Sequence, residues 1–357
     1  MGALYLFALG QADAPNPEQE TSMIFANETP NPEKENRTLL TADTPAKEIV
    51  VCIDPGHGGD NAGARYNGYE EKDMDLRIAM AMYEELTKYQ GVTVVMTRTD
   101  DSFLSLKERA EIAQACSADL FVCLHLNASL YHNQFGAEVW VSGFGEYYAT
   151  GASFGKIVLQ ELSQQGIFTG RGVKTRIGAD GTDYYGVIMH CTAREIPAVI
   201  VEHCYMDELR DESFWRNEEA LDALGKADAT AVAKYFGLRS EELAVDYGDY
   251  VIEAVPSPSG VVYQDFTPPD FCKVTLLAYD ANTRMASVHV EARDYQSGIC
   301  YYNYSTDGGR TWSKTRLWGN EPERDIIVFA PSALSKDILV RVWNNYCEYR
   351  QSNRIFL

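Results

Sequence analysis

Apolar residues between positions 49 and 237 recur in two alternating patterns. Short runs rich in β-branched residues predict strands buried on both faces, because such runs fit a sheet that is covered by helices. Longer segments between them carry apolar residues at helical spacing. The predicted strands are IVVCI (49–53), VTVVM (92–96), DLFVCLHL (119–126), AEVWV (137–141), YGVIM (185–189) and PAVIV (197–201).

Helical periodicity predicts helices between these strands. The segment MDLRIAMAMYEELTKYQ (74–90) precedes Gly91, a residue typical of helix ends. The segment SLKERAEIAQAC (105–116) begins at Ser105, a suitable N-cap, and residues 212–237 form a long helical stretch that ends in glycine. This alternation predicts an α/β fold with a twisted, mostly parallel or mixed sheet and helices on both of its faces.

The pattern changes after about residue 240. Aromatic-rich runs now alternate apolar and polar residues at short intervals, which is typical of a sandwich of two sheets. We predict an α/β unit at 48–238, a linker at 239–262 and a small all-β sandwich at 263–357 that resembles immunoglobulin-like modules. The predicted strands of the sandwich are KVTLLAYD (273–280), MASVHVEARD (285–294), ICYYNYSTD (299–307), DIIVFA (325–330) and DILVRVWN (337–344).

The N-terminal residues 1–47 fit neither pattern. MGALYLFALGQADA pairs a short apolar stretch with Ala12-Asp13-Ala14, which predicts a truncated signal-like segment and secretion. Residues 15–47, rich in Pro, Glu, Asn and Thr, predict a disordered linker. No apolar run approaches the roughly 18 residues of a transmembrane span. The formal net charge of −21 argues against nucleic acid as a partner.

Histidines and glutamates follow several predicted strands. His57 lies in the glycine-rich turn DPGHGG after the first strand, and Glu70 and Glu71 come shortly afterwards. His125 and Glu202 close two further strands. Because ligand sites of open α/β sheets lie at the carboxyl ends of the strands, these side chains are expected to converge. Two imidazoles and a carboxylate suit a catalytic zinc, and a further glutamate can move protons.

Several motifs, in this order, resemble the zinc-dependent N-acetylmuramoyl-L-alanine amidases of the amidase-3 type, a family of cell-wall hydrolases. The motifs are IDPGHGG, EEKDMDL, TRTDDSFLSLKERAEIAQ, ADLFVCLHLNAS and PAVIVE. Each motif is ordinary by itself, whereas the ordered set is highly specific. The resemblance covers about residues 48–237, which is the whole predicted α/β unit.

The resemblance implies a Zn²⁺ cofactor and a set of roles. The metal ligands would be His57, Glu71 and His125, and Glu202 would be the catalytic glutamate. The family's ligand is the glutamate directly before Lys-Asp, which favours Glu71 over Glu70. Glu202 would take a proton from zinc-activated water and deliver it to the departing amine. The implied substrate is peptidoglycan, cleaved between N-acetylmuramic acid and L-alanine.

This chain also departs from the family pattern. Asp75 stands where the family more usually has Asn. The segment EHCYMDE begins at Glu202, where the family tends to have E-x-G-F followed by Ser-Asn, so that Cys204 replaces a glycine and His203 adds an imidazole.

Four residues near these motifs are weaker candidates for contacts with ligands or substrate. Asp54 could orient a ligand histidine or cap the glycine-rich turn. Asn127 is favoured as an organiser of its loop rather than a catalyst. Arg171 and Lys174 lie in a predicted substrate-side loop, where they could meet stem-peptide carboxylates. Outside this group, Arg98 in TRTD and Arg109 in KERA are expected to form structural salt bridges.

Two other functions remain open from the sequence alone. A zinc carboxypeptidase usually shows a His-x-x-Glu pair, whereas the matching positions here are His57 and Asp60. A non-catalytic wall-binding protein would not need the combination of His57, Glu71, His125 and Glu202. In each case the C-terminal sandwich could contact the cell wall or another surface component.

Overall fold

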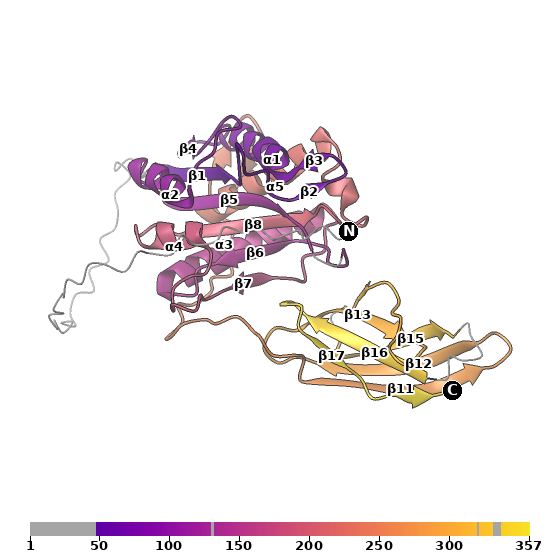
Figure 1. Ribbon diagram of the computed structural model, residues 1–357. Coiled ribbons are helices and arrows are strands. Elements are labelled where there is room, and N and C mark those ends of the chain that lie inside the picture. The colour runs from indigo at the N-terminus through magenta and orange to yellow at the C-terminus, as the bar shows by residue number, and fades with distance from the viewer. Residues whose placement is uncertain (1–47, 130–131, 320, 331–336) are drawn as a thin grey trace.

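A six-stranded mixed sheet forms the centre of the α/β unit (Figure 1). The structure is a computed structural model that describes residues 48–129, 132–319, 321–330 and 337–357. The predicted signal-like segment and linker at 1–47 therefore lie outside the described residues. In spatial order the strands are β4 (Val92–Met96), β1 (Ile49–Pro55), β5 (Leu120–Asn127), β8 (Ala198–Tyr205), β6 (Glu138–Val141) and β7 (Val173–Thr175).

Strand direction changes once across this sheet. β4, β1, β5 and β8 are parallel, β6 is antiparallel to β8, and β7 is parallel to β6. Side chains along β5 alternate between two cores: Leu120 and Val122 face one core, whereas Phe121 and Cys123 face the other. Such alternation requires cover on both faces of the sheet.

Helices provide that cover. The first face packs against α1 (Glu71–Leu86), α3 (Gly145–Gln164) and α5 (Glu218–Phe236), and the second against α2 (Leu106–Ala115) and α4 (Gly186–Thr192). The α/β class, the mixed sheet and the helices on both faces are confirmed. Ser105 caps α2 as expected, because its side chain and that of Glu108 form a reciprocal capping box.

One predicted strand is wrong. The run YGVIM does not extend the sheet; most of it forms α4, which packs against α2. A short apolar run cannot be told from a buried helical turn by periodicity, and here Val187, Ile188 and Cys191 bury one side of the helix. Helix α3 was not foreseen either. Its Gly151 and Gly155 bring the helix backbone close to Val141 and Val139 of β6.

The C-terminal unit consists of two antiparallel sheets around a core of their own. This arrangement is an all-β sandwich, as predicted, whereas its likeness to immunoglobulin modules and the limits of all the predicted units stay predictions. One sheet contains β11 (Phe271–Asp280), β12 (Met285–Arg293) and β15 (Glu323–Phe329). The other contains β14 (Arg316–Leu317), β13 (Ile299–Ser305), β16 (Asp337–Asn344), β17 (Tyr349–Gln351) and β18 (Ile355–Phe356).

Short elements complete the described fold. The hairpin of β2 and β3 precedes α1, a 3₁₀ turn η1 precedes α5, and the ribbon of β9 and β10 follows α5. Their bounds are β2 (Arg65–Tyr66), β3 (Tyr69–Glu70), η1 (Glu212–Phe214), β9 (Arg239–Ser240) and β10 (Val245–Asp246).

The free edge of β7 is covered by residues that follow the α/β unit. The Tyr346 hydroxyl accepts a hydrogen bond from Thr175 N and donates one to Thr175 O, at 3.1 and 3.2 Å. The Gln264 side chain bonds both backbone groups of Ile177, at 2.8 and 3.0 Å. The C-terminal unit and the segment leading to it therefore satisfy backbone groups of the α/β unit.

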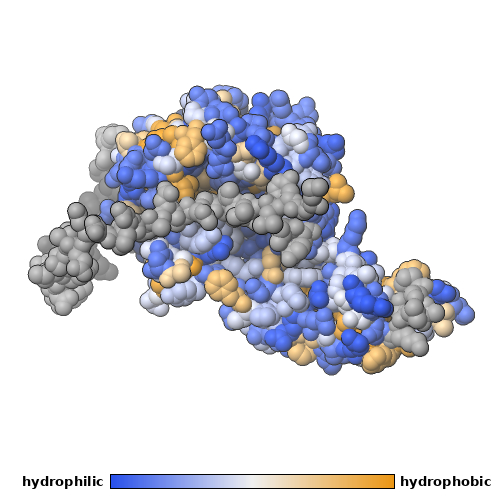
Figure 2. Space-filling view, in the orientation of Figure 1, coloured by the Kyte–Doolittle hydropathy of each residue, from blue (hydrophilic) through white to orange (hydrophobic). Residues whose placement is uncertain are grey.

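Figure 2 shows mostly hydrophilic residues on the visible face of both units, with smaller apolar patches. Of the helices within the described ranges, none is both long and apolar enough to cross a membrane. All eight cysteines lie in these ranges, and each is a free thiol.

Candidate metal centre

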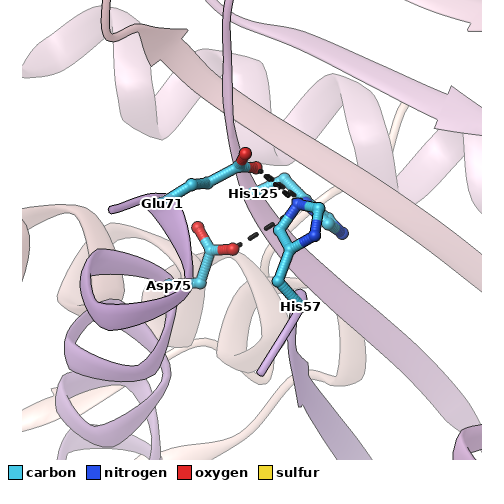
Figure 3. A group of neighbouring side chains, drawn as sticks. All are labelled: His57, Glu71, Asp75 and His125. Atoms are coloured by element: carbon cyan, nitrogen blue, oxygen red, sulfur yellow. Dashed lines mark hydrogen bonds and ion pairs between the residues drawn. The ribbon is translucent and has the colours of Figure 1, made fainter. Parts of the chain in front are cut away.

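Three segments that are distant in the sequence meet at the carboxyl ends of β1 and β5 (Figure 3). His57 lies in the turn after β1, Glu71 is the first residue of α1, and His125 lies near the end of β5. The Nε2 atom of His57 is 3.1 Å from Glu71 Oε1, and the Nδ1 atom of His125 is 2.9 Å from the same oxygen. Two imidazole nitrogens thus converge on one carboxylate oxygen.

The turn that carries His57 has a left-handed backbone. His57 has φ = +57°, a conformation that costs free energy for a residue with a side chain. Two buried arginines hold the carbonyl groups of this turn: Arg109 donates to Pro55 O and His57 O, and Arg98 donates to Pro55 O and Gly56 O. The carbonyl groups of the turn are therefore held by side chains of the protein itself.

Glycines at two positions make room for the metal-site side chains. A Cβ atom at Gly56 would lie 2.2 Å from the ring of His125. Gly63 has φ = +67°, and a Cβ atom there would lie 2.5 Å from both Glu71 Oε2 and the His57 ring. The glycine-rich loop is thus required because imidazoles and a carboxylate pack directly on its backbone.

Asn61 orients the His57 ring, a role that sequence reasoning did not foresee. Its Oδ1 accepts a hydrogen bond from Gly63 N, which identifies this atom as the oxygen. His57 Nδ1 lies 3.0 Å from the same oxygen, so Nδ1 carries the proton and Nε2 is left as a free donor atom for a metal. A short polar residue four positions after the histidine was the only signal in the sequence.

The structure places Glu71, rather than Glu70, beside the two imidazoles. Glu71 is buried, and its other oxygen accepts a hydrogen bond from Ala64 N at 2.6 Å. Glu70 instead forms an ion pair with Arg65 at 2.9 Å in the hairpin before α1. Asp60, the residue that the carboxypeptidase pattern would use, is exposed.

Several buried polar atoms around this group lack hydrogen-bond partners among the described residues. They are His57 Nε2, both carboxylate oxygens of Asp75, and Glu202 Oε2. One donor atom from each of His57, Glu71, Asp75 and His125 lies within 4.8 Å of the others. Unpaired buried donors of this kind are costly unless a cation neutralises them, and nitrogen and oxygen donors suit Zn²⁺. The residues present therefore fit the metal that the resemblance implies.

Glu202 lies next to this group because of the strand register. On the face of the sheet covered by α2 and α4, His125 pairs with Glu202 on β8, and Glu202 pairs with Glu138 on β6. Side chains directly opposite each other on one face have Cβ atoms about 5 Å apart. Glu202 is buried, and this burial, together with the charges of Glu71 and Glu138, raises its pKa well above the usual range. Its carboxylate is thus prepared to hold a proton.

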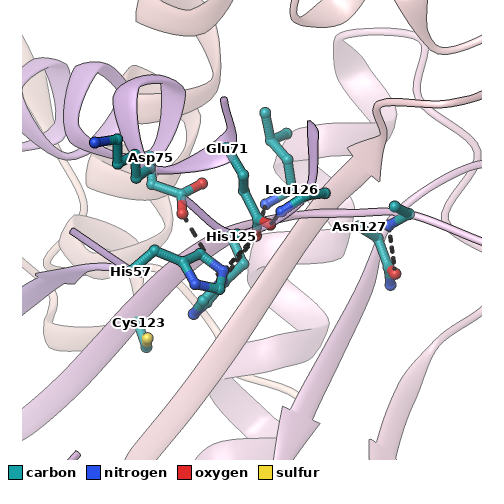
Figure 4. A network of polar contacts seen from close by, with 12 residues as sticks. His57, Glu71, Asp75, Cys123, His125, Leu126 and Asn127 are labelled. Carbon is teal, nitrogen blue, oxygen red and sulfur yellow. Dashed lines mark hydrogen bonds and ion pairs between the residues drawn. The ribbon is translucent and has the colours of Figure 1, made fainter. Parts of the chain in front are cut away.

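Glu138 is the centre of a buried charged network. Its Oε2 accepts hydrogen bonds from Arg171 and Lys174, each at 2.6 Å, and its Oε1 accepts one from Asn127 Nδ2 at 3.0 Å. Burial alone would raise the pKa of Glu138, but the two cations lower it to about 2. Figure 4 shows Asn127 set apart from the group formed by His57, Glu71, Asp75 and His125. Asn127 thus links the end of β5 to this network.

Arg171 and Lys174 are each about 2 % exposed. Arg171 also contacts the C-terminal unit, where it donates to the Tyr301 hydroxyl at 3.3 Å. The expected contact of these two cations with stem-peptide carboxylates stays a prediction, and their burial argues against it.

Asp54 supports the His57 turn indirectly, through the side chains that it contacts. Its Oδ1 accepts from Arg109 at 2.7 Å and from the Thr97 hydroxyl, and its Oδ2 accepts from the Cys123 thiol at 2.9 Å. Asp54 therefore holds the arginine that holds the turn, and its two roles considered from the sequence stay predictions.

His203 points away from the group, towards α5. It forms a buried pair with Asp228 at 2.8 Å, and its Nδ1 lies 3.0 Å from the backbone carbonyl of His125. The extra imidazole of the EHCYMDE segment thus supports the backbone of β5 and does not join the metal-site donors.

The fold and the donor set together define an α/β protein with a candidate zinc centre at the carboxyl edge of its sheet. A family model for N-acetylmuramoyl-L-alanine amidases of the amidase-3 type matches residues 51–234, just over half of the chain. The chain belongs to this amidase family. The C-terminal sandwich lies outside the matched range.

Comparisons with individual proteins found the following similarities. The chain is 28 % identical over 192 residues to a sporulation-specific N-acetylmuramoyl-L-alanine amidase of Bacillus subtilis, covering 54 % of this chain and 69 % of the relative. It is 30 % identical over 195 residues to an endolysin of Bacillus phage SPP1, covering 54 % and 68 %. A crystal structure of an N-acetylmuramoyl-L-alanine amidase from Clostridium difficile 630 matches 54 % of this chain and 98 % of its own, with 29 % identity and a TM-score of 0.47.

Proposed function

We propose that the α/β unit is a zinc-dependent peptidoglycan hydrolase that cleaves the amide bond between N-acetylmuramic acid and L-alanine. The observation that supports this most is the convergence of His57 Nε2, Glu71 Oε1 and His125 Nδ1. Glu202 is paired with His125 across the two strands and has a carboxylate oxygen without a hydrogen-bond partner among the described residues. A wall-binding protein would gain nothing from burying these four groups together, because their burial costs stability. Membership of an amidase family supports the same bond type.

The proposed roles of the residues follow from their positions. His57, Glu71 and His125 hold the ion, and Asn61 fixes the ring of His57 with Nε2 towards it. When bound, zinc supplies Lewis-acid polarisation of the scissile carbonyl and lowers the pKa of a water molecule. Glu202 accepts the proton that the water loses as its oxygen bonds to the lactyl carbonyl carbon. Glu202 then delivers this proton to the nitrogen of L-alanine as the C–N bond breaks, which restores its carboxylate.

The surroundings of Glu202 suit this proton transfer. Burial and the neighbouring carboxylates Glu71 and Glu138 raise the pKa of Glu202, which suits the second step, in which Glu202 holds a proton before it delivers it to the amine. Arg171 and Lys174 keep Glu138 ionised, so the negative charge beside Glu202 persists at neutral pH.

The proposal includes a location and a partner. Peptidoglycan lies outside the cytoplasmic membrane, so the protein would act after export, at the cell wall. The C-terminal sandwich would place the α/β unit on the wall or on another surface component.

Product analysis tests the proposed reaction. Full-length protein loaded with Zn²⁺ is incubated with purified peptidoglycan, and the new ends are identified by mass spectrometry. We expect stem peptides with a free L-alanine amino group and glycan strands that keep intact muramic acid with a free lactyl carboxylate. Ends created between two amino acids of the stem would instead indicate a peptidase, and an unchanged substrate would indicate a binding protein.

Metal removal provides the matched control for that experiment. Because the three proposed ligands come from distant segments, dialysis against a chelator is expected to abolish product release and to lower the melting temperature. Addition of Zn²⁺ should restore both. Full activity in protein shown by elemental analysis to be free of metal would contradict the proposed cofactor.

A further inference from the structure

Asp75 shares the metal-site face of α1 with Glu71. The two residues are four positions apart, so they lie one helical turn apart on the same side of the helix. Asp75 is 0 % exposed, and its Oδ2 lies 3.8 Å from His125 Nδ1. Figure 3 shows its carboxylate directed towards the two imidazoles, beside that of Glu71.

The two oxygens of Asp75 have no hydrogen-bond partner among the described residues. The neighbouring arginines are not its hydrogen-bond partners, and most of their N–H groups bond to other acceptors. Arg98 donates to the carbonyl groups of Pro55, Gly56, Lys72 and Asp100, and Arg109 donates to Asp54 and to the carbonyl groups of Pro55, His57 and Leu104. A fully buried carboxylate next to a second carboxylate is costly to keep charged unless a cation lies beside it, and the imidazole of His125 and the carboxylate of Glu71 lie where such a cation would bind.

Asp75 also does not lie where a residue that only orients a ligand imidazole would lie. Such residues bind the ring nitrogen that faces away from the ion. Asp75 approaches Nδ1 of His125, the nitrogen that faces Glu71, and the outer nitrogen of His57 is already bonded to Asn61. The carboxylate therefore occupies the ligand side of both rings.

We infer that Asp75 is a fourth protein ligand of the metal, which makes the centre a two-histidine, two-carboxylate site. This inference rests on the proposed metal-dependent function. Tetrahedral ligands at about 2.0–2.2 Å from zinc lie about 3.3–3.6 Å from one another, and the 3.8 Å between Asp75 and His125 is close to that spacing. The carboxylates of Glu71 and Asp75 together would balance the charge of a divalent ion. Water would bind as a fifth ligand, as zinc permits during catalysis.

Metal binding by full-length Asp75→Asn tests this inference without any substrate. The change keeps the size of the side chain and removes its charge. We expect the affinities for Co²⁺ and Zn²⁺, measured by chelator competition, to fall by about tenfold to a hundredfold. The visible spectrum of the Co²⁺ form should also change, because it reports the number and type of ligands. Asp73→Asn, an exposed change on the same helix, serves as the matched control and should leave both unchanged.

Thermal stability gives an independent readout. Without metal, Asp75→Asn should melt at the same temperature as the unchanged protein or higher, because an unpaired buried charge is gone. With metal, its gain in melting temperature should be smaller. Unchanged metal affinity and an unchanged Co²⁺ spectrum in Asp75→Asn would overturn the inference. Protein that binds metal through Asp75 but leaves peptidoglycan intact would instead refute only the proposed function.

Discussion

Glu202→Gln is expected to lower kcat on peptidoglycan by about 10²–10⁴-fold, the range that a positioned general acid–base group contributes. The amide keeps the size of the side chain but cannot take the proton of the attacking water. Because Glu202 Oε2 has no hydrogen-bond partner among the described residues, the change should disturb little else. The rate of release of L-alanine amino termini measures the effect.

Metal content separates this role from a structural one. Glu202→Gln should bind Zn²⁺ in the same ratio as the unchanged protein, because Glu202 is not among the proposed ligands. Glu84→Gln, at an exposed position of α1, is the matched control and should keep full activity. A Glu202→Gln protein with a normal rate would remove Glu202 from the mechanism. Loss of metal in the same variant would instead assign it to the ligand set.

Arg109→Met is expected to lower the free energy of unfolding of the metal-free protein by about 3–5 kcal/mol, the cost of leaving a buried charge without its partner. Arg109 and Asp54 are 3 % and 0 % exposed, and Arg109 also holds two carbonyl groups of the His57 turn. Chemical denaturation in the presence of a chelator measures the loss without a contribution from metal binding.

Two comparisons make this prediction specific. Lys107→Met removes an exposed cation from the same helix, whose ion pair with Glu111 spans 3.5 Å, and should cost less than about 1 kcal/mol. The double change Asp54→Asn with Arg109→Met should recover part of the loss, because no buried charge is then left alone. If Arg109→Met cost no more than Lys107→Met, the buried pair would not be what holds the turn.

Much of the α/β architecture could be predicted because its signals are local. The cap at Ser105 depends on a pattern within three residues, and the alternation of Leu120 to Leu124 between two cores is typical of a sheet that is covered on both faces. The strand YGVIM was assigned wrongly, because five apolar residues fit a strand and a helical turn equally well. Helix α3 was missed because glycines such as Gly151, which weaken the helical signal, are needed for close packing on β6.

The candidate centre was predictable to a similar extent. The residues His57, Glu71, His125 and Glu202 could be proposed from motifs, because each lies near or just after the end of a strand or begins a helix. The role of Asn61 depends on the left-handed backbone at His57, which sequence spacing does not reveal.

The charged residues around the centre were harder to assign. The burial of Arg171 depends on strand register and on contacts with a tyrosine 130 positions away. Asp75 stood out only as a departure from the family pattern, and its proximity to both imidazoles required the fold.

Tyr346 and Gln264 also affect how the molecule behaves among its own copies. Unpaired backbone groups on the edge strand of a sheet can pair with strands of other molecules, which leads to aggregation. Here a phenol and an amide occupy those groups on Thr175 and Ile177. These contacts would limit self-association through this edge, and an isolated α/β unit that ended near residue 238 would leave the same backbone groups uncovered.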